Sequence, residues 1–470
     1  MASSADDRAR LINQLLAGEY CAAADAIITA SAPARLDVSG GLAAHTGGVV
    51  AQSTLGMRAT VAVAPRRDGY LWIFICSSGN ARQAQIRLAI SHLLDADWRA
   101  DVSSHPGDDA ICFNLALTTM RHIATRIHFG NVRNVGEGLS IGIDNAISLR
   151  GSTAAFNALA AALVQCLCDY YRIAATPLEK AEMAAHALAE GGVSHAHTVD
   201  ALTALCAPTG GGACLLRYRC QPHQLLGTIP VADNIQLLAI ELDAKNPDAP
   251  AIAQRVMVAG AMGMRIIETV YRDLGLEPNT GGYLGNISPG LYKRYFRALL
   301  PRRMRGRDFT RSYGELPGVG IDLDHFYHIR AAVDHLIGEG DYAENFLQAM
   351  EELAPNWNEP LPEAARILSA QRAGRLLLAS QHSYRLRLGL SSPHADWVIA
   401  RLTDAAAGCG AYGARVTEMG DGQLVIVLMP ASVKATDHLL GVVSEYGREF
   451  GVSPRIYRTG TPSSAGALLS

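Results

Sequence analysis

The sequence predicts an α+β fold in two domains, and three observations predict it. Segments typical of strands and of helices are mixed along the chain without a regular βαβ repeat. The length of 470 residues allows two or three domains of ordinary size. Apolar residues make up 49% of the chain and charged residues 18%, which excludes a globally disordered protein.

The first half of the chain alternates strands and helices. The hydrophobic pattern predicts, in order, a β-hairpin of 58–65 with 70–76, a buried alanine-rich helix capped by Ser152 or Thr153, an amphipathic helix at 177–190, and strands at 210–219 and 235–243.

The second half is mainly helical and ends in a small α/β segment. Predicted helices cover 251–271, 329–354, 363–382, 396–407 and 433–450, with a strand at 423–429. The domain break is expected between Tyr218 and Asp233, which gives one domain at 20–225 and another at 226–465.

Charge and cysteine content restrict the partners and the compartment. The 41 basic and 44 acidic residues give no electrostatic reason for nucleic acid or an anionic membrane as the main partner. Nine scattered cysteines without a CxxC pair are typical of a reduced, cytoplasmic protein. The N-terminal residues do not resemble a secretory signal, and the longest apolar run, 153–168, is too short to span a bilayer. We expect a cytoplasmic protein with no nucleic-acid or membrane partner, and its oligomeric state is left open.

Two local features have ordinary explanations. The basic segment 291–311 interleaves aromatic and cationic residues, and we expect a solvated surface or an oligomer contact there rather than a nucleic-acid patch. The glycines at 210–212 predict a hairpin turn.

Arg35 is the first candidate functional residue. It follows a proline-marked bend and precedes several glycines, and an arginine in such a place can hold a phosphate or carboxylate by two hydrogen bonds. The alternative is an ordinary strand and turn with a surface arginine.

Asp200 is the second candidate. A carboxylate after a glycine-opened loop can act as a general base. The nearby His186, His195 and His197 also allow a metal site, since His195 and His197 face one side of an extended segment. The structural alternative is that Asp200 is the N-cap of the following helix.

The third candidate is the start of the helix after Arg150. Gly151, Ser152 and Thr153 would offer free backbone N–H groups and two hydroxyls, which together form an anion site and a possible Mg²⁺ ligand. Any capped, buried helix has the same pattern.

Taken in order, these segments resemble the galactokinase and L-arabinokinase branch of the GHMP small-molecule kinases. The opening motif of that branch is approximately APGRLDVMGGIADYSG, and residues 32–47 are APARLDVSGGLAAHTG. HTVDA matches the family's aspartate element at Asp200, and 145–155 matches its phosphate loop. Further blocks extend the resemblance to about Met429, at 262–267, 282–289, 382–396 and 413–427.

The resemblance implies a two-domain GHMP-kinase-like fold with the active site in the cleft between the domains. It implies transfer of the γ-phosphoryl group of ATP, with Mg²⁺, to a hydroxyl of a sugar or sugar-like small molecule. By position, Asp200 orients or deprotonates that hydroxyl and Arg35 stabilises the developing charge. The other implied contacts are Arg150, Gly151, Ser152 and Thr153 for ATP, Ser152 for Mg²⁺, and Asp37, Gly41, His45 and Gly420 for the substrate.

Large side chains replace several glycines of the family. Ile147 and Leu149 stand in the phosphate loop, where they would crowd a backbone cradle for phosphate. Glu418 and Met419 replace glycines of the third motif, and Ala44 stands where relatives have an aspartate for sugar hydroxyls.

These departures leave three functions open. The first is a kinase for a sugar-like acceptor, and the second is a pseudokinase that binds ligands or regulates without turnover. The third is altered chemistry on the same scaffold, with another phosphoryl donor or a metal bound by His195 and His197.

Overall fold

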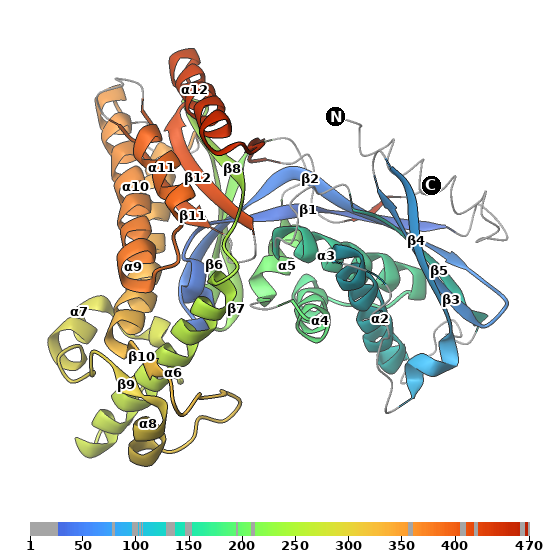
Figure 1. Cartoon of the computed structure of the whole chain (residues 1–470), viewed down its shortest axis with the longest axis horizontal. Helices are drawn as coiled ribbons and strands as arrows, with labels where there is room; N and C mark the ends of the chain where they lie inside the picture. The colour runs from blue at the N-terminus through green and yellow to red at the C-terminus, as the bar shows by residue number, and fades with distance from the viewer. Residues whose placement is uncertain are drawn as a thin grey trace. The chain divides into compact units, whose positions relative to one another are not determined.

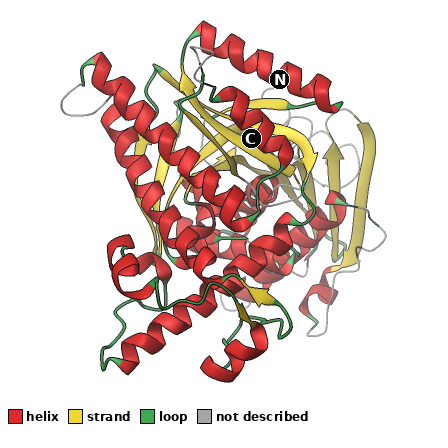
Figure 2. Ribbon diagram, turned by 60° about the vertical axis from the view of Figure 1, so that its left-hand side comes forward, coloured by secondary structure: helices red, strands yellow, loops and turns green. Residues whose placement is uncertain are grey.

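The computed structural model describes residues 27–77, 80–95, 102, 105, 107–127, 137–145, 153–193, 196–207, 212–355, 361–404, 410–417, 422–460 and 466–468. Helices and strands are mixed over these residues, so the predicted α+β class is confirmed (Figure 1, Figure 2). The chain divides into two compact units, each discontinuous in sequence. Unit 1 contains Met1–Leu36, Thr54–Gly212 and Gly460–Ser470, and unit 2 contains Asp37–Ser53 and Ala213–Thr459.

This division differs from the single boundary expected between residues 225 and 226. A single cut cannot separate two units when the chain crosses from one to the other several times. The expected boundary also falls inside a strand, β7 (His223–Pro230), which pairs with β6 (Cys214–Cys220). Both strands belong to unit 2, where β6 pairs with Val49–Gln52.

The sheet of unit 1 has the strand order β14-β1-β2-β5-β3-β4. Its strands are β1 (Ile28–Ser39), β2 (Val49–Pro65), β3 (Tyr70–Ser77), β4 (Asn80–Ala89), β5 (Leu139–Asn145) and β14 (Gly466–Leu468). The ends of β1 and β2 continue into unit 2.

The predicted hairpin of 58–65 with 70–76 is wrong, because β5 lies between these two strands. β5 pairs antiparallel with β2 and parallel with β3. The turn that was expected to close the hairpin instead donates hydrogen bonds from the backbone N–H groups of Arg66 and Gly69 to the residues that precede β5. The hairpin partner of β3 is β4, which follows it directly.

Four α-helices and a short 3₁₀ turn complete the described part of unit 1. They are η3 (Ile90–Leu94), α2 (Asp108–Ile127), α3 (Thr153–Tyr171), α4 (Pro177–Glu190) and α5 (Thr198–Cys206). The predicted amphipathic helix is confirmed as α4, and its first turn is fixed by a capping box between Thr176 and Glu179. Helix α5 is capped by His197, so the alternative that made Asp200 the N-cap is wrong.

Helix α3 is buried over most of its length, as its apolar sequence predicts. It is also the one helix of the described residues that is long and apolar enough to cross a membrane by length and composition alone. The expectation that this run is too short is therefore wrong, because the helix continues past Cys168 to Tyr171. In the structure 83% of the apolar window is buried, as in the core helix of a folded domain.

Unit 2 contains a four-stranded antiparallel sheet with the order β11-β12-β8-β13. These strands are β8 (Ile235–Lys245), β11 (Gly413–Thr417), β12 (Gly422–Pro430) and β13 (Arg455–Arg458). The major helices are α6 (Ala249–Asp273), α9 (Ile329–Leu353), α10 (Glu363–Ser383), α11 (Pro393–Leu402) and α12 (Val433–Phe450). Apolar side chains from these helices and from the sheet form one large core.

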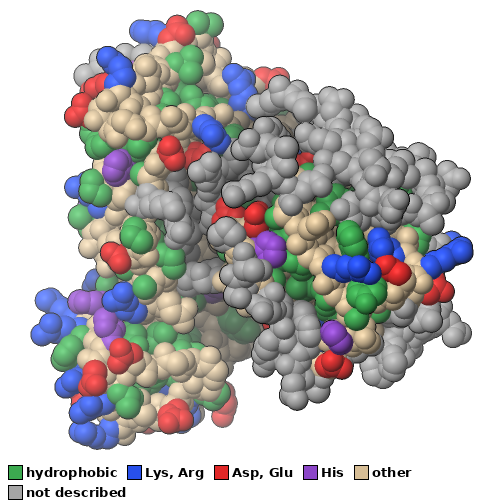
Figure 3. Space-filling model, turned by 45° about the vertical axis from the view of Figure 1, so that its right-hand side comes forward, with side chains coloured by type: hydrophobic (Ala, Val, Ile, Leu, Met, Phe, Trp, Pro, Cys, Tyr) green, Lys and Arg blue, Asp and Glu red, His purple; other side chains and the backbone are tan. Residues whose placement is uncertain are grey.

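Unit 2 also contains shorter elements. They are η2 (Gly41–Thr46), η5 (Leu284–Asn286), α7 (Pro289–Leu291), η6 (Tyr292–Phe296), α8 (Gly306–Tyr313), η7 (Tyr384–Leu388) and the two-stranded ribbon of β9 (Met304–Arg305) with β10 (Phe326–Tyr327). The basic segment runs from α7 to α8, and three of its arginines form ion pairs: Arg297 with Asp334, and Arg305 and Arg307 with Asp324. On the face drawn in Figure 3, basic side chains at the lower left alternate with acidic ones. The predicted absence of a nucleic-acid partner stays a prediction.

The described cysteines are free thiols, in agreement with the absence of a disulfide framework that their spacing predicts. They are Cys76, Cys112, Cys166, Cys168, Cys206, Cys214 and Cys220. Cys21 and Cys409 lie outside the described residues, as do Gly210 and Gly211 of the predicted glycine turn.

Candidate active site

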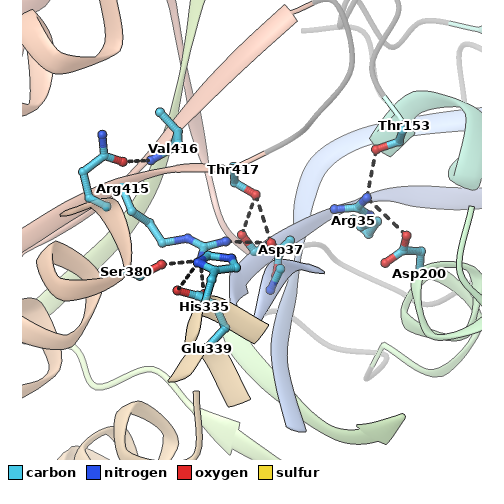
Figure 4. Close-up of polar contacts among 12 residues, drawn as sticks. Arg35, Asp37, Thr153, Asp200, His335, Glu339, Ser380, Arg415, Val416 and Thr417 are labelled. Carbon is cyan, nitrogen blue, oxygen red and sulfur yellow. Dashed lines mark hydrogen bonds and ion pairs between the residues drawn. The ribbon is translucent and has the colours of Figure 1, made fainter. Parts of the chain in front are cut away.

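Three of the predicted site residues meet in unit 1 (Figure 4). Arg35 lies on β1, Thr153 is the first residue of α3, and Asp200 lies in the first turn of α5. The Arg35 Nη2 atom donates a hydrogen bond of 2.9 Å to the Thr153 hydroxyl and lies 3.2 Å from the Asp200 Oδ2 atom. The fold therefore brings Arg35 next to two residues that lie more than a hundred positions further along the chain.

The Arg35–Asp200 pair is almost fully buried. The side chains are 7% and 8% exposed, and charged groups are rarely buried to this extent unless an opposite charge compensates them. The position of Asp200 in the first turn of α5 adds a favourable interaction with the positive end of the helix dipole. The ordinary surface arginine that was the alternative for Arg35 is excluded.

His197 positions the helix that carries Asp200. Its Nδ1 atom accepts a hydrogen bond of 3.3 Å from the Val199 backbone N–H, which caps α5. His195, the other half of the predicted metal pair, lies outside the described residues. His197 therefore has a capping role in the described structure. The predicted metal site of His195 and His197 stays a prediction.

The start of α3 is the described part of the predicted ATP site. Thr153 is held from two sides, because its hydroxyl accepts from Arg35 and its backbone carbonyl accepts a 2.8 Å hydrogen bond from Asn157 Nδ2. A long helix offers unpaired N–H groups at its N-terminus, and with a guanidinium alongside these donors fit a phosphate. Arg150, Gly151 and Ser152 lie outside the described residues, as do the substituted positions of the phosphate loop and the third motif.

A second arginine cluster lies in unit 2, around Asp37 of β1 (Figure 4). The Arg415 Nη2 atom donates a 2.7 Å hydrogen bond to Asp37 Oδ2. Its Nη1 atom donates to Glu339 Oε2 at 3.1 Å and to the Ser380 hydroxyl at 2.9 Å. The Arg415 side chain is 0% exposed, so protein groups and not solvent compensate its charge.

The protein itself uses both carboxylate oxygens of Asp37. The Thr417 hydroxyl donates to the Asp37 backbone carbonyl at 2.8 Å and contacts Oδ2 at 3.4 Å, and the Gly41 N–H donates to Oδ1 at 3.3 Å. Gly41 has a φ of 43°, and a Cβ at this position would collide with the Tyr384 hydroxyl. These contacts favour a positioning role for Asp37 and Gly41, and their predicted substrate contacts stay predictions.

Burial controls the protonation of the Arg415 cluster. It lowers the pKa of His335 to about 3, with the Arg415 charge acting in the same direction, so this imidazole is neutral at physiological pH. The His335 Nδ1 atom lies 2.9 Å from the Ser383 hydroxyl. Burial raises the pKa of Glu339 above its ordinary value, although the positive charge of Arg415 acts in the opposite direction and lowers it. Burial alone would lower the pKa of Arg415, but Asp37, Tyr384 and Glu339 raise it above its ordinary value.

His45 and Gly420 are the two remaining predicted substrate residues. His45 lies in η2 and lines a largely apolar cavity of about 260 Å³ in unit 2, together with Met257, Met264 and Tyr283. Gly420 lies outside the described residues.

Comparison with known proteins decides the fold family. No family model matches the chain. The curated L-arabinokinase of Arabidopsis thaliana is 22% identical over an alignment of 501 positions, which covers 93% of this chain and 46% of that protein. Lactococcus lactis galactokinase, solved in complex with galactose, superposes with a TM-score of 0.65 at 13% identity, covering 94% of this chain and 95% of that one. Methanococcus jannaschii mevalonate kinase gives a TM-score of 0.53 at 10% identity, covering 92% and 98%.

The chain has the GHMP kinase fold. The resemblance to the galactokinase and L-arabinokinase branch, which the motifs predict, is confirmed. The chain spans about half the length of the curated arabinokinase that it matches. At these identities the solved structures establish the fold of this GHMP-like chain and leave its activity to be argued from its own residues.

The GHMP kinase motifs did not predict the Arg415 cluster. Arg415 belongs to the segment that was compared with the glycine-rich third motif, and Glu339 and His335 lie on α9, where no motif was recognised. One signal was present: an arginine interrupts the short apolar strand GARVT, all of which is buried. A buried arginine requires carboxylate partners, but the sequence does not identify them.

Proposed function

We propose that this protein transfers the γ-phosphoryl group of ATP to a hydroxyl of a sugar or sugar-like small molecule. The observation that carries the proposal is the buried Arg35–Asp200 pair beside Thr153 at the start of α3. The similarity to proteins named L-arabinokinase and galactokinase supports the kinase class and a carbohydrate acceptor.

The chemistry assigns a different task to each residue. Phosphoryl transfer depends on positioning and on neutralising charge, since the transferred group and its oxygens bear most of the negative charge. Asp200 would accept a hydrogen bond or the proton from the acceptor hydroxyl and so orient it for attack. Arg35 presents a planar guanidinium, which suits the oxygens of a phosphoryl group.

ATP and Mg²⁺ are part of the proposal. Thr153 and Arg35 supply donors that fit a phosphate, and the proposed ATP contacts continue into Arg150, Gly151 and Ser152. Ser152 is the proposed Mg²⁺ ligand. When bound, the metal would neutralise charge on the phosphates. Substrate contacts from Asp37, Gly41, His45 and Gly420 are proposed on the motif alone.

A pseudokinase is the second candidate function, and a specific observation favours it. Ile147, Leu149, Glu418 and Met419 replace glycines of the two family loops that approach nucleotide phosphates. A protein of this kind would keep ligand binding and lose turnover.

A ligand panel separates the two candidates. The protein is incubated with Mg·ATP and a set of monosaccharides and polyols, ADP formation is measured, and ³¹P NMR detects a new phosphate ester. The kinase proposal predicts ADP and a phosphate ester with at least one acceptor, above the rate of ATP hydrolysis without acceptor.

Thermal melts with the same ligands complete the test, because a ligand that binds the native state raises the melting temperature. Stabilisation by nucleotide or sugar without a product supports the pseudokinase and contradicts the kinase. If neither a nucleotide nor a sugar raises the melting temperature at millimolar concentration and no product forms, both proposals fail.

A further inference from the structure

Two histidines and a glutamate converge on the surface of unit 1, apart from the Arg35–Asp200 pair. His122 lies on α2, and His186 and Glu190 lie on α4. The donor atoms of the three side chains all lie within 4.8 Å of one another. We propose that they form a binding site for one divalent transition-metal ion of the Zn²⁺ class.

The fold builds this convergence from regular helices. His186 and Glu190 are four positions apart on α4, and this spacing puts both side chains on one face of the helix. The adjoining helix α2 lies close to the same turn of α4, because the Thr118 hydroxyl oxygen is 3.3 Å from the Ala187 carbonyl oxygen. Thr118 lies one turn before His122, so the two helices are close together at the site.

The distances suit a tetrahedral metal. The two oxygens of Glu190 divide between the histidines, with Oε2 lying 3.4 Å from His122 Nε2 and Oε1 lying 3.4 Å from His186 Nε2. Zn–N and Zn–O bonds of about 2.0–2.2 Å at tetrahedral angles separate neighbouring donors by roughly 3.3–3.5 Å. The two imidazole rings are also close, with centroids 4.4 Å apart. The side chains of all three residues are at least partly exposed and can turn to direct one donor atom each at a common ion.

The donor set selects the kind of metal. Two imidazoles and one carboxylate suit Zn²⁺ and its neighbours Cu²⁺, Ni²⁺ and Co²⁺, whereas Mg²⁺ and Ca²⁺ prefer oxygen ligands throughout. The side chains of His186 and Glu190 are 62% and 47% exposed, so solvent can supply the fourth ligand. The ion would fasten α2 to α4.

The same distances also fit a protonated imidazole that donates to Glu190, so binding has to be measured directly. Isothermal titration of Zn²⁺ into tag-free protein, stripped of metal with chelator, tests the proposal. We expect one site with a dissociation constant in the micromolar range or below. Mg²⁺ should give no heat that depends on these residues.

Variants assign the site. His186→Ala combined with Glu190→Gln should weaken Zn²⁺ binding by more than about tenfold and remove the Zn²⁺-induced rise in melting temperature. His382→Ala, at an exposed histidine on α10, should leave both unchanged. Because His186 and Glu190 are exposed, the apo variants should melt like the wild type.

Co²⁺ supplies a spectroscopic check, since a tetrahedral Co²⁺ site absorbs visible light strongly. We expect this absorption in the wild type and in His382→Ala, and its loss in the double variant. Absence of Zn²⁺ binding in the wild type, or equal binding in the double variant, overturns the proposal. Neither result bears on the proposed kinase function, because the assay contains no nucleotide or sugar.

Discussion

The two arginine–carboxylate clusters contain the same kind of ion pair but differ in their surroundings. Among the described residues Arg35 pairs with Asp200, and it lies at the start of α3, where helix N–H groups fit a phosphate. Arg415 pairs with two carboxylates, Asp37 and Glu339, and is 0% exposed. An ion pair therefore does not identify an active site; the groups around it do.

Hydrogen-bonding groups of the protein surround the cluster in unit 2. The hydroxyls of Ser380 and Thr417 and the backbone N–H of Gly41 contribute hydrogen bonds, so Arg415 joins β1, α9, α10 and β11. Removing one charge there leaves another charge buried without compensation, which is costly. We expect substitutions in this cluster to affect folding, and substitutions at Arg35 and Asp200 to affect turnover in addition to stability.

The largest expected effect on stability is that of Arg415→Met. This change leaves Asp37 and Glu339 buried without their cation, and we expect the free energy of unfolding to fall by about 3–5 kcal/mol. Urea denaturation measures it. Arg385→Met, which breaks the exposed pair with Asp396, is the control and should cost less than about 1 kcal/mol. Equal losses in the two variants would contradict a stabilising role of the buried Arg415 cluster.

Gly41→Ala should cost about 2–4 kcal/mol of unfolding free energy, because φ is positive there and the new Cβ meets the Tyr384 hydroxyl. Tyr384→Phe removes that hydroxyl. A double-mutant cycle should therefore find the combined variant more stable than the sum of the two single changes. Strict additivity would show that the collision is not the cause.

The lowered pKa of His335 should make the stability of the protein depend on pH. Its pKa of about 3 in the folded protein is below the ordinary value, so the unfolded chain binds the proton more tightly. The contribution of neutral His335 to the free energy of unfolding is fully present above pH 6.5 and is lost as the pH falls towards 3. Between pH 7 and pH 5 this single group should cost about 2 kcal/mol. Denaturation at both pH values should show this difference in wild type and not in His335→Asn, and an identical pH dependence in both proteins would contradict the burial argument.

The smallest expected effect is at Thr153. Thr153→Ala removes the acceptor of the Arg35 hydrogen bond, and we expect kcat to fall about five- to tenfold, corresponding to about 1 kcal/mol. Thr153→Ser keeps the hydroxyl and should retain most of the activity. Similar rates for the alanine and serine variants would show that this bond does not position Arg35.

Elements with local signals were predictable from the sequence. Helix α4 has clear start signals in Thr176, Pro177 and Glu179, and it was predicted with its observed bounds. Strand pairing was not predictable, because β5 enters between β2 and β3 from a segment about sixty residues further along the chain. A turn sequence predicts only the nearest partner.

The candidate site divides in the same way. Arg35, Thr153 and Asp200 were predicted because the family motifs that contain them are local. Arg415 was missed because its carboxylate partner Asp37 is 378 positions away, and no local pattern connects the two. Buried charge networks of this kind become visible only when the chain is folded.

The turnover number of Asp200→Asn, measured with its free energy of unfolding, tests the central claim most directly. Asparagine has the size of aspartate but cannot accept a proton or compensate the charge of Arg35. Asp334→Asn is the matched control, because Asp334 also pairs with an arginine, Arg297, through a carboxylate that is only 11% exposed.

Asp200→Asn leaves the buried charge of Arg35 without its carboxylate, so we expect a loss of stability as well, and kcat is measured where denaturation shows the variant to be folded. With an acceptor from the panel and Mg·ATP, we expect kcat of the folded variant to fall by about 10²–10⁴-fold. The Asp334→Asn control should keep kcat close to that of the wild type. A kcat for Asp200→Asn within twofold of the wild type would contradict the assignment of the Arg35–Asp200 pair to catalysis.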